Sequence, residues 1–229
     1  MDFSFFDVRN YKTLSVQEGY KEWSTSYEQT VSDLMDIRLL DKITCINWEK
    51  IHNVIDLACG TGRIGCWLSK KGIKEIDGVD FTQQMLEIAN HKSVYKNLVC
   101  GNILATDFEP DYFDLAIEVL ADEHISDLTP LYKEASRIIK PNGYFVVVGY
   151  HSHFLMNGVI THFNSATGEP LAIKSHVHLF SDHVKAAHKA NLTLIDLNEG
   201  VIDDEWIKLK PKWEKFYMHP VSFSIVWKK

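Results

Sequence analysis

The segment VIDLACGTGRIG combines a glycine spacing with acidic residues that could hold a charged ligand. Gly60, Gly62 and Gly65 have the G-x-G-x-x-G spacing, which lets backbone approach a bound group at the start of a helix. Asp56 precedes these glycines, and Asp80 follows them about twenty residues later. A carboxylate at position 56 would repel a pyrophosphate by roughly 4 kcal/mol per charge pair at about 4 Å and an effective dielectric of about 20. The pattern therefore favours a ligand with positive charge over a dinucleotide.

Apolar runs alternate with helical patterns on both sides of this loop. This alternation predicts an α/β fold with a doubly wound, mostly parallel sheet of seven strands and right-handed crossovers. The seventh strand follows the sixth with no evident crossover helix, so we expect it to be antiparallel. The strands are predicted at residues 53–58, 75–80, 97–102, 112–120, 143–151, 192–200 and 220–229. The helices between them are predicted at residues 63–72, 81–92, 127–143 and 181–192, with Thr82 and Ser181 as caps.

The composition limits the class of partner. The 229 residues carry a formal net charge of −7, which gives a nucleic-acid partner no electrostatic support. The longest apolar runs have the length of strands, so we predict no membrane span. The N-terminus lacks a basic, apolar leader, and the four cysteines form no C-x-x-C pair, so we expect a cytoplasmic protein with reduced thiols. The sequence leaves open whether the protein is a monomer or a homodimer.

The position of the glycine loop leaves two ligands to compare. In an open parallel sheet, ligands lie over the carboxyl ends of the strands beside the first strand, and NAD and S-adenosylmethionine would both lie there. S-adenosylmethionine carries an ammonium and a sulfonium, which a nearby carboxylate stabilises. The charge of Asp56 therefore favours the methyl donor.

DLACGTGRIG followed by GVDFTQQMLEIA resembles the class I S-adenosylmethionine-dependent methyltransferases of small-molecule type, over about residues 20–150. The resemblance implies a Rossmann-like methyltransferase fold with S-adenosylmethionine as cofactor. It implies that Asp56 holds the methionine end, that Asp80 accepts hydrogen bonds from both ribose hydroxyls, and that Glu118 lies beneath the methyl group. The other residues that it places at the cofactor are Ala58, Gly60, Thr61, Gly62, Phe81, Met85, Asn102 and Ile103.

Three aromatic residues near the N-terminus fall on one face of a predicted helix. Tyr20, Trp23 and Tyr27 are spaced i, i+3 and i+7. An amphipathic helix packed on the domain would show the same spacing. The resemblance implies that this segment folds over the cofactor as a lid, as a similar segment does in small-molecule methyltransferases. We therefore count these three residues as cofactor-binding.

Histidines concentrate after the fifth predicted strand. His151 and His153 form one H-x-H pair, and His176 and His178 form another. This spacing can bind a metal, but no acidic or cysteine ligand accompanies it at a clear interval, so no metal site is predicted. The resemblance implies that this region covers the methyl acceptor. We therefore assign substrate contacts to Tyr150, His153, His178 and Trp206.

The sequence thus predicts one methyltransferase domain over residues 1–229. Residues 1–40 form a helical lid, residues 41–150 the cofactor-binding core, and residues 151–229 the acceptor side and the last strands. The predicted reaction is O- or N-methylation of a small molecule by in-line displacement, with His151 and Glu118 as catalytic residues and His151 orienting or deprotonating the acceptor. The alternatives are a non-catalytic S-adenosylmethionine-binding protein and an NAD-dependent oxidoreductase.

Overall fold

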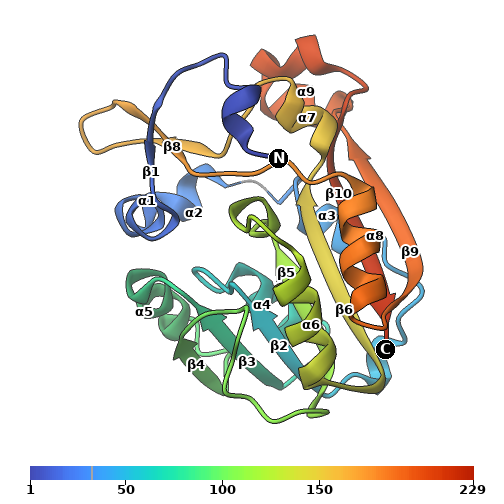
Figure 1. Ribbon diagram of the computed structural model, residues 1–229. Helices are drawn as coiled ribbons and strands as arrows, with labels where there is room; N and C mark the ends of the chain where they lie inside the picture. Colours follow the sequence, from blue (N-terminus) through green and yellow to red (C-terminus); the bar gives the residue numbers. More distant parts are fainter. Residues whose placement is uncertain (32) are drawn as a thin grey trace.

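The computed structural model describes residues 1–31 and 33–229, and a seven-stranded sheet forms its centre (Figure 1). The strand order is β4-β3-β2-β5-β6-β10-β9, and all neighbours are parallel except that β10 is antiparallel to both β6 and β9. This arrangement confirms the predicted fold class and the antiparallel last strand. The strands are β2 (Asn53–Leu57), β3 (Glu75–Asp80), β4 (Asn97–Cys100), β5 (Phe113–Val119), β6 (Ile139–Tyr150), β9 (Thr193–Val201) and β10 (Pro220–Lys228).

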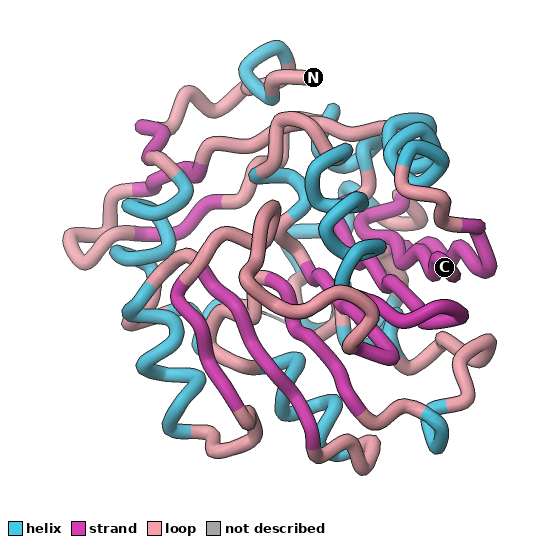
Figure 2. The backbone as a smooth tube through the Cα atoms, turned by 60° about the horizontal axis from the view of Figure 1, so that its bottom comes forward, coloured by secondary structure: helices cyan, strands magenta, loops and turns pink. Residues whose placement is uncertain are grey.

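Helices cover both faces of this sheet because its central strands are apolar on both sides. Successive side chains of a strand point to opposite faces. Phe145 and Val147 of β6 accordingly pack with α6 (Thr129–Ile138) and α8 (Phe180–Lys189), whereas Val146 and Val148 pack with α3 (Ile37–Leu40) and α4 (Arg63–Lys70). Helix α5 (Gln83–His91) connects β3 to β4. Figure 2 shows the strands as one twisted layer between these helices.

Each of the four predicted helices is longer than the observed one, most of all at the end of α6. Helix α6 ends at Ile138, five residues before the predicted end at 143, because Ile139 is already extended and pairs with Phe113 of β5. Helix α8 begins after Leu179, and the backbone N–H of Leu179 donates to the carboxylate of Asp182 at 3.0 Å. Ser181 lies inside the helix and does not cap it.

A second, three-stranded sheet was not predicted. It has the order β1-β8-β7, formed by β1 (Lys12–Leu14), β8 (Pro170–Ile173) and β7 (His162–Asn164). It joins the N-terminal segment to the region after β6, where the sequence shows little regular pattern. The first forty residues are therefore only partly helical, with α1 (Val16–Trp23) and α2 (Tyr27–Thr30) next to the small sheet (Figure 1).

Short helices complete the chain around the end of the sheet where β5 and β6 finish. These are α7 (Ser152–Met156), α9 (Asp204–Leu209) and the 3₁₀ turns η1 (Phe3–Phe5), η3 (Asp122–His124) and η4 (Pro211–Phe216), whereas η2 (Trp48–Lys50) directly precedes β2 at the opposite end of the sheet. None of the helices in the described part of the chain is long and apolar enough to cross a membrane.

The third glycine of the loop sets how closely α4 approaches its neighbours. A Cβ built on Gly65 would overlap Cζ and Oη of Tyr95. The Tyr95 hydroxyl accepts from the Gly65 N–H at 3.2 Å and donates to Oδ2 of Asp56 at 2.7 Å. The glycine thus leaves room for a tyrosine that joins the start of α4 to the end of β2.

We expect Gly65→Ala to lower the free energy of unfolding by about 1–3 kcal/mol, because the added methyl displaces the Tyr95 ring. Urea denaturation would measure this loss. Ser69→Ala, an exposed change in the same helix, is the control and should alter stability by less than about 0.5 kcal/mol. Equal stability of the two variants would contradict the packing role of Gly65.

Candidate active site

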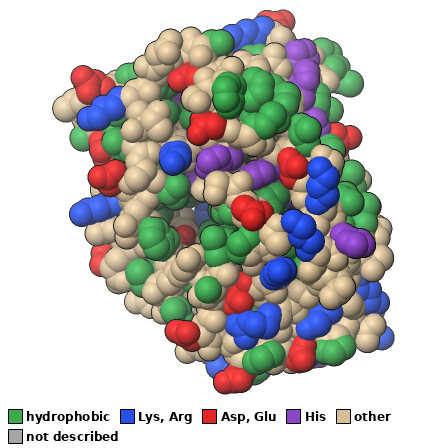
Figure 3. All heavy atoms as spheres, viewed as in Figure 1, with side chains coloured by type: hydrophobic (Ala, Val, Ile, Leu, Met, Phe, Trp, Pro, Cys, Tyr) green, Lys and Arg blue, Asp and Glu red, His purple; other side chains and the backbone are tan. Residues whose placement is uncertain are grey.

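A cavity of about 410 Å³ lies over the carboxyl ends of β2, β3 and β5, and we call it the loop cavity. Its walls come from the glycine loop, the segments that follow β3, β4 and β5, and the aromatic face of α1 and α2. Figure 3 shows the molecule hollowed near the middle of this view, among hydrophobic and histidine side chains. The lining residues are Val16, Tyr20, Tyr27, Ala58, Gly60, Asp80, Phe81, Thr82, Met85, Gly101, Asn102, Ile103, Leu104, Val119, Leu120, Ala121, His124, Ile125, Ser126, Asp127 and Pro130.

The structure brings most of the predicted cofactor residues together at this cavity. Those that line it are Tyr20, Tyr27, Ala58, Gly60, Asp80, Phe81, Met85, Asn102 and Ile103. Five predicted residues are not among the described residues that line it: Trp23, Asp56, Thr61, Gly62 and Glu118.

Asp80 fixes the shape of the loop cavity. Its Oδ2 accepts from the backbone N–H of Gly60 and its Oδ1 from that of Thr82, both at 2.8 Å. Burial raises the pKa of this carboxyl, and these hydrogen bonds act against the rise. Since each carboxylate oxygen can accept a second hydrogen bond, both remain able to bind a ligand hydroxyl.

The backbone beside Asp80 leaves space for a ligand. Gly60 has φ of +52°, and a Cβ built on it meets no atom within 4 Å, so its open side faces the cavity. Ala58 and Leu120, which also line the cavity, have φ of 62° and 58°. Left-handed conformations at residues other than glycine are uncommon and concentrate at functional sites.

Asp56 takes a different place from the predicted one. It is 1% exposed beneath the glycine loop, and its Oδ2 accepts from the Tyr95 hydroxyl. Burial raises the pKa of this carboxyl to about 7. Asp56 therefore holds the loop from below and does not reach the cavity, and the carboxylate that faces a ligand is Asp80. Tyr95 was missed because it lies outside the motif.

Glu118 is likewise buried away from the cavity, although the three residues that follow it line the cavity. Its Oε1 accepts from the backbone N–H groups of Ala121 at 2.6 Å and Asp122 at 3.0 Å, so it fixes the turn after β5. Burial raises its pKa well above the ordinary value. The structure thus gives Glu118 a structural contact where the sequence predicted one beneath the methyl group.

Asn102 lines the cavity, but its carbonyl oxygen is used internally. Oδ1 accepts from the backbone N–H of Leu104 at 2.9 Å. The side chain can therefore offer its N–H groups to a ligand more readily than its carbonyl oxygen.

His124 is a lining residue that the sequence did not single out. Its Nδ1 donates to the carbonyl of Lys174 at 2.8 Å, which leaves Nε2 to accept from the Tyr20 hydroxyl at 2.8 Å. Burial lowers the pKa of His124 to about 4, so the ring is neutral. The hydrogen bond between Tyr20 and His124 holds α1 over the loop cavity. Only the tertiary structure reveals this contact, because 103 residues separate the two partners in the chain.

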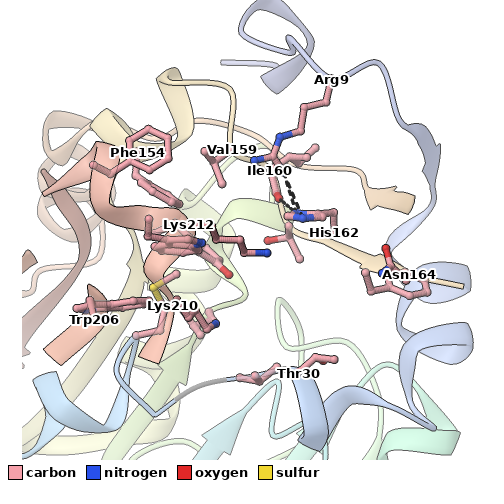
Figure 4. Close-up of a pocket in the computed structure, with 18 of the residues that line it drawn as sticks. Arg9, Thr30, Phe154, Val159, Ile160, His162, Asn164, Trp206, Lys210 and Lys212 are labelled. Atoms are coloured by element: carbon pink, nitrogen blue, oxygen red, sulfur yellow. Dashed lines mark hydrogen bonds between the residues drawn. The ribbon is translucent and has the colours of Figure 1, made fainter. Parts of the chain in front are cut away.

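A second cavity of about 910 Å³ lies next to the first, and we call it the aromatic cavity. Figure 4 shows it between the N-terminal segment and small sheet on one side and α9 with η4 on the other. The lining residues are Arg9, Tyr11, Trp23, Thr30, Val31, Met35, Leu120, Tyr150, Phe154, Val159, Ile160, Thr161, His162, Phe163, Asn164, Trp206, Leu209, Lys210, Pro211, Lys212, Trp213, Lys215 and Phe216.

The two cavities meet at Leu120 and at the aromatic residues of α1 and α2. Leu120 lines both. Tyr20 and Tyr27 line the loop cavity and Trp23 the aromatic cavity, with ring centroids 5.9 Å apart for Tyr20–Trp23 and 4.8 Å for Trp23–Tyr27. The predicted aromatic face therefore forms a wall that two ligands could share.

Only some of the residues predicted to contact the acceptor line a cavity in the structure. Tyr150 and Trp206 line the aromatic cavity, whereas His153 and His178 are not among the described residues lining either cavity. His153 lies beside His219, with Nε2 3.3 Å from Nδ1 of that ring. Nε2 of His178 donates to the carbonyl of Ile125 at 2.7 Å.

His151 is also absent from the described lining of both cavities. Its Nδ1 accepts from the backbone N–H of His153 and caps α7, and its Nε2 contacts Oε1 of Glu199 at 2.7 Å. Because both ring nitrogens are occupied, the structure does not support the predicted role of His151 in orienting or deprotonating an acceptor. In the described residues, no group of three or more His, Cys, Asp or Glu side chains is arranged to hold a metal ion.

Comparisons with known proteins define the class of this site. Residues 55–147 match the family model described as "Methyltransferase domain". The chain is 32% identical over 106 residues to the biotin biosynthesis bifunctional protein BioHC of Saccharophagus degradans, a match that covers 44% of the chain and 19% of that protein. It is 33% identical over 118 residues to an uncharacterized methyltransferase of Schizosaccharomyces pombe, covering 45% and 41%. An uncharacterized methyltransferase of Emericella nidulans is 25% identical over 225 residues, covering 79% and 77%.

Solved structures share the fold. An S-adenosylmethionine-dependent methyltransferase from Mesorhizobium loti has a TM-score of 0.66 at 17% identity, covering 86% of this chain and 98% of that one. The chain spans about a fifth and about two fifths of the first two relatives, so their whole activities do not transfer to it. Residues 55–147 therefore form a methyltransferase domain, and S-adenosylmethionine is the cofactor of the solved methyltransferase whose fold the chain shares.

The loop cavity fits this cofactor on its own chemistry. Asp80 offers two acceptor oxygens for a pair of hydroxyls, and the open side of Gly60 lets a ligand approach the backbone. Met85 and Ile103 provide apolar surface for a flat ring, and the aromatic rings of Tyr20 and Tyr27 in the wall can stabilise a sulfonium.

We expect Asp80→Asn to weaken binding of S-adenosylhomocysteine by at least about tenfold, because a charge-assisted hydrogen bond contributes roughly 1.5–3 kcal/mol. Titration calorimetry would measure the change. Asp77→Asn is the matched control: Asp77 is a buried carboxylate on the same strand that accepts from Asn97 at 2.6 Å, outside the loop cavity. Unchanged affinity in a folded Asp80 variant would remove Asp80 from the site.

The raised pKa of Asp56 gives a second prediction. The pKa of this carboxyl is 3.8 in the unfolded chain and about 7 in the folded one, so between these pH values folding has to return a proton that the unfolded carboxyl has lost. The free energy of unfolding therefore declines as pH increases through this range. Between pH 5 and pH 8, Asp56→Asn should remove about 2–3 kcal/mol of this decline. Urea denaturation at both pH values tests it, and equal declines in variant and wild type would contradict it.

Proposed function

We propose that the chain transfers the methyl group of S-adenosylmethionine to a small-molecule acceptor bound in the aromatic cavity. The observation that carries this proposal is the meeting of two cavities at Leu120, one fitted to the cofactor and the other large enough for a second molecule. Cavities of about 300–1,000 Å³ with apolar walls and a few polar groups are typical small-molecule sites.

The aromatic wall supports methyl transfer between these cavities. The cofactor supplies a methyl group on a sulfonium, whose departure as a neutral thioether needs no added acid. The chain then has to align the acceptor with the methyl–sulfur bond and to exclude water. Leu120, Trp23 and Tyr27 lie where the two molecules would meet and present apolar or aromatic surface. In this proposal residues 1–40 act as a lid, residues 41–150 hold the cofactor, and residues 151–229 shape the acceptor side.

A proton acceptor is needed only for acceptors that lose a proton on methylation, such as hydroxyls. His151 and Glu118 do not reach either cavity, so neither fits this role. The wall of the aromatic cavity offers Thr161, whose hydroxyl donates to Oε1 of Glu123 at 2.9 Å. Burial raises the pKa of Glu123 to about 7, so this carboxyl can gain or lose a proton near neutral pH.

A screen of small molecules with a radiolabelled methyl donor tests the proposal. We expect labelled product from at least one acceptor and micromolar or tighter affinity for S-adenosylhomocysteine. Cofactor binding with no transfer to any acceptor would favour a non-catalytic S-adenosylmethionine-binding protein. Preferential binding of NAD would overturn the proposal in favour of the oxidoreductase.

With an acceptor in hand, Trp213→Ala should raise the KM for the acceptor by about tenfold and leave the KM for the donor within twofold. The reason is that Trp213 lies in the wall of the aromatic cavity, stacked on Trp206 at 4.8 Å, and buried aromatic residues contribute strongly to binding. Steady-state kinetics would separate the two constants.

The control for this variant is Tyr217→Ala, since Tyr217 follows η4, is 45% exposed and is not among the described residues lining either cavity. It should leave both constants near those of the wild type. A rise in the donor KM alone for Trp213→Ala would place the acceptor elsewhere.

A further inference from the structure

The charge of the aromatic cavity is opposite to that of the whole protein. The chain has 31 acidic against 24 basic residues. The cavity is lined by Arg9, Lys210, Lys212 and Lys215, and none of its described lining residues is Asp or Glu. The cavity therefore holds a local excess of positive charge in an acidic protein.

These cations come from two opposite walls. Nη1 of Arg9 lies 3.2 Å from Nε2 of His162, whose Nδ1 donates to the carbonyl of Ile160, so the histidine anchors the guanidinium at the small sheet. Lys210 and Lys212 enter from the α9–η4 wall, and Figure 4 shows the ammonium of Lys212 pointing across the cavity toward His162. An anionic group between the walls would lie between the two sets of cations.

The protein itself does not neutralise these cations. Among residues 1–31 and 33–229, no carboxylate oxygen lies within 4.0 Å of a side-chain nitrogen of the four basic residues. The acids at the start of α9 are engaged elsewhere, since Asp203 and Glu205 pair with Arg38. Burial lowers the pKa of Lys210, and the charge of Lys212 lowers it further. A bound anion would supply the missing counter-charge.

The rest of the cavity wall is aromatic. Trp206 and Trp213 are stacked at 4.8 Å with planes 11° apart, and Phe154 lies 5.2 Å from Trp213. On the side of the cofactor wall, Trp23 and Phe163 are stacked at 5.3 Å. Such surfaces bind extended apolar or aromatic bodies, and they line the same cavity as the cations and Leu120.

We propose, building on the proposed function, that the acceptor is an amphipathic anion, with an apolar body against the aromatic wall and a carboxylate or phosphate between the Arg9 and Lys210–Lys212 sides. The anionic group anchors the molecule, and the apolar body carries the methylated atom toward Leu120. A cationic acceptor is excluded by the same charges, which would repel it from both walls.

A matched pair of fluorescent probes tests this charge requirement. 8-Anilino-1-naphthalenesulfonate and N-phenyl-1-naphthylamine share one aromatic body and differ in the sulfonate. We expect Lys210→Gln and Lys212→Gln each to weaken binding of the sulfonate by about fivefold or more, and that of the neutral probe by less than twofold. Lys208→Gln is the control, because Lys208 is an exposed lysine of α9 outside the described lining.

Displacement of the sulfonate by decanoate, decyl phosphate and decanol distinguishes the anionic groups. Stronger displacement by decanoate assigns a carboxylate, and stronger displacement by decyl phosphate assigns a phosphate. Equal displacement by decanol, or equal weakening of both fluorescent probes in the lysine variants, would overturn the inference.

Calorimetry with S-adenosylhomocysteine on the same variants separates this inference from the function on which it rests. Unchanged cofactor affinity together with lost sulfonate binding supports both. A wild type that binds the sulfonate through its lysines but no S-adenosylhomocysteine would overturn the proposed function and leave the anion site standing.

Discussion

The hydrogen bonds to the carboxylate of Asp80 are the interaction on which the loop cavity depends. It lies at the end of β3 and accepts one backbone N–H from the glycine loop after β2 and another from the start of α5. Two loops that are separate in the chain are thereby held at one edge of the sheet. Because the same two oxygens retain free lone pairs, the group that shapes the cavity also faces the ligand. One buried carboxyl group thus shapes the cavity and offers acceptor oxygens to a ligand.

A second constraint acts beneath the loop. Asp56, Tyr95 and Gly65 form a chain of hydrogen bonds that joins β2 to α4, and glycine is required at position 65 by the Tyr95 ring. The loop is therefore held at two points. The buried carboxyl of Asp56 acts on it through Tyr95 and Gly65, and the carboxylate of Asp80 accepts from Gly60. This explains why two aspartates accompany one glycine motif while only one of them lines the loop cavity.

The aromatic cavity, where we propose that the acceptor binds, is built from different elements. Its wall is assembled from the N-terminal segment, the small sheet and the α9–η4 region, which surround a cavity rich in aromatic rings and cations. Leu120, which directly follows β5, and Tyr150, the last residue of β6, join this wall to the core sheet. A regular sheet edge can in this way carry a second cavity that is built from less regular segments.

The sequence by itself determined the parallel core, because strand and helix periods depend on local side-chain patterns, and it determined the glycine loop with Asp80, because motif spacing fixes their place at the strand ends. It did not determine the small sheet, since β1 and β8 pair across more than 150 residues and each is too short to show a pattern. It also placed Asp56, Glu118 and His151 by their proximity to motif or strand ends, whereas side-chain direction and burial decided their contacts. The positive aromatic cavity belongs to the tertiary structure alone, because Arg9 and Lys212 meet only when the two ends of the chain fold over the same edge of the sheet.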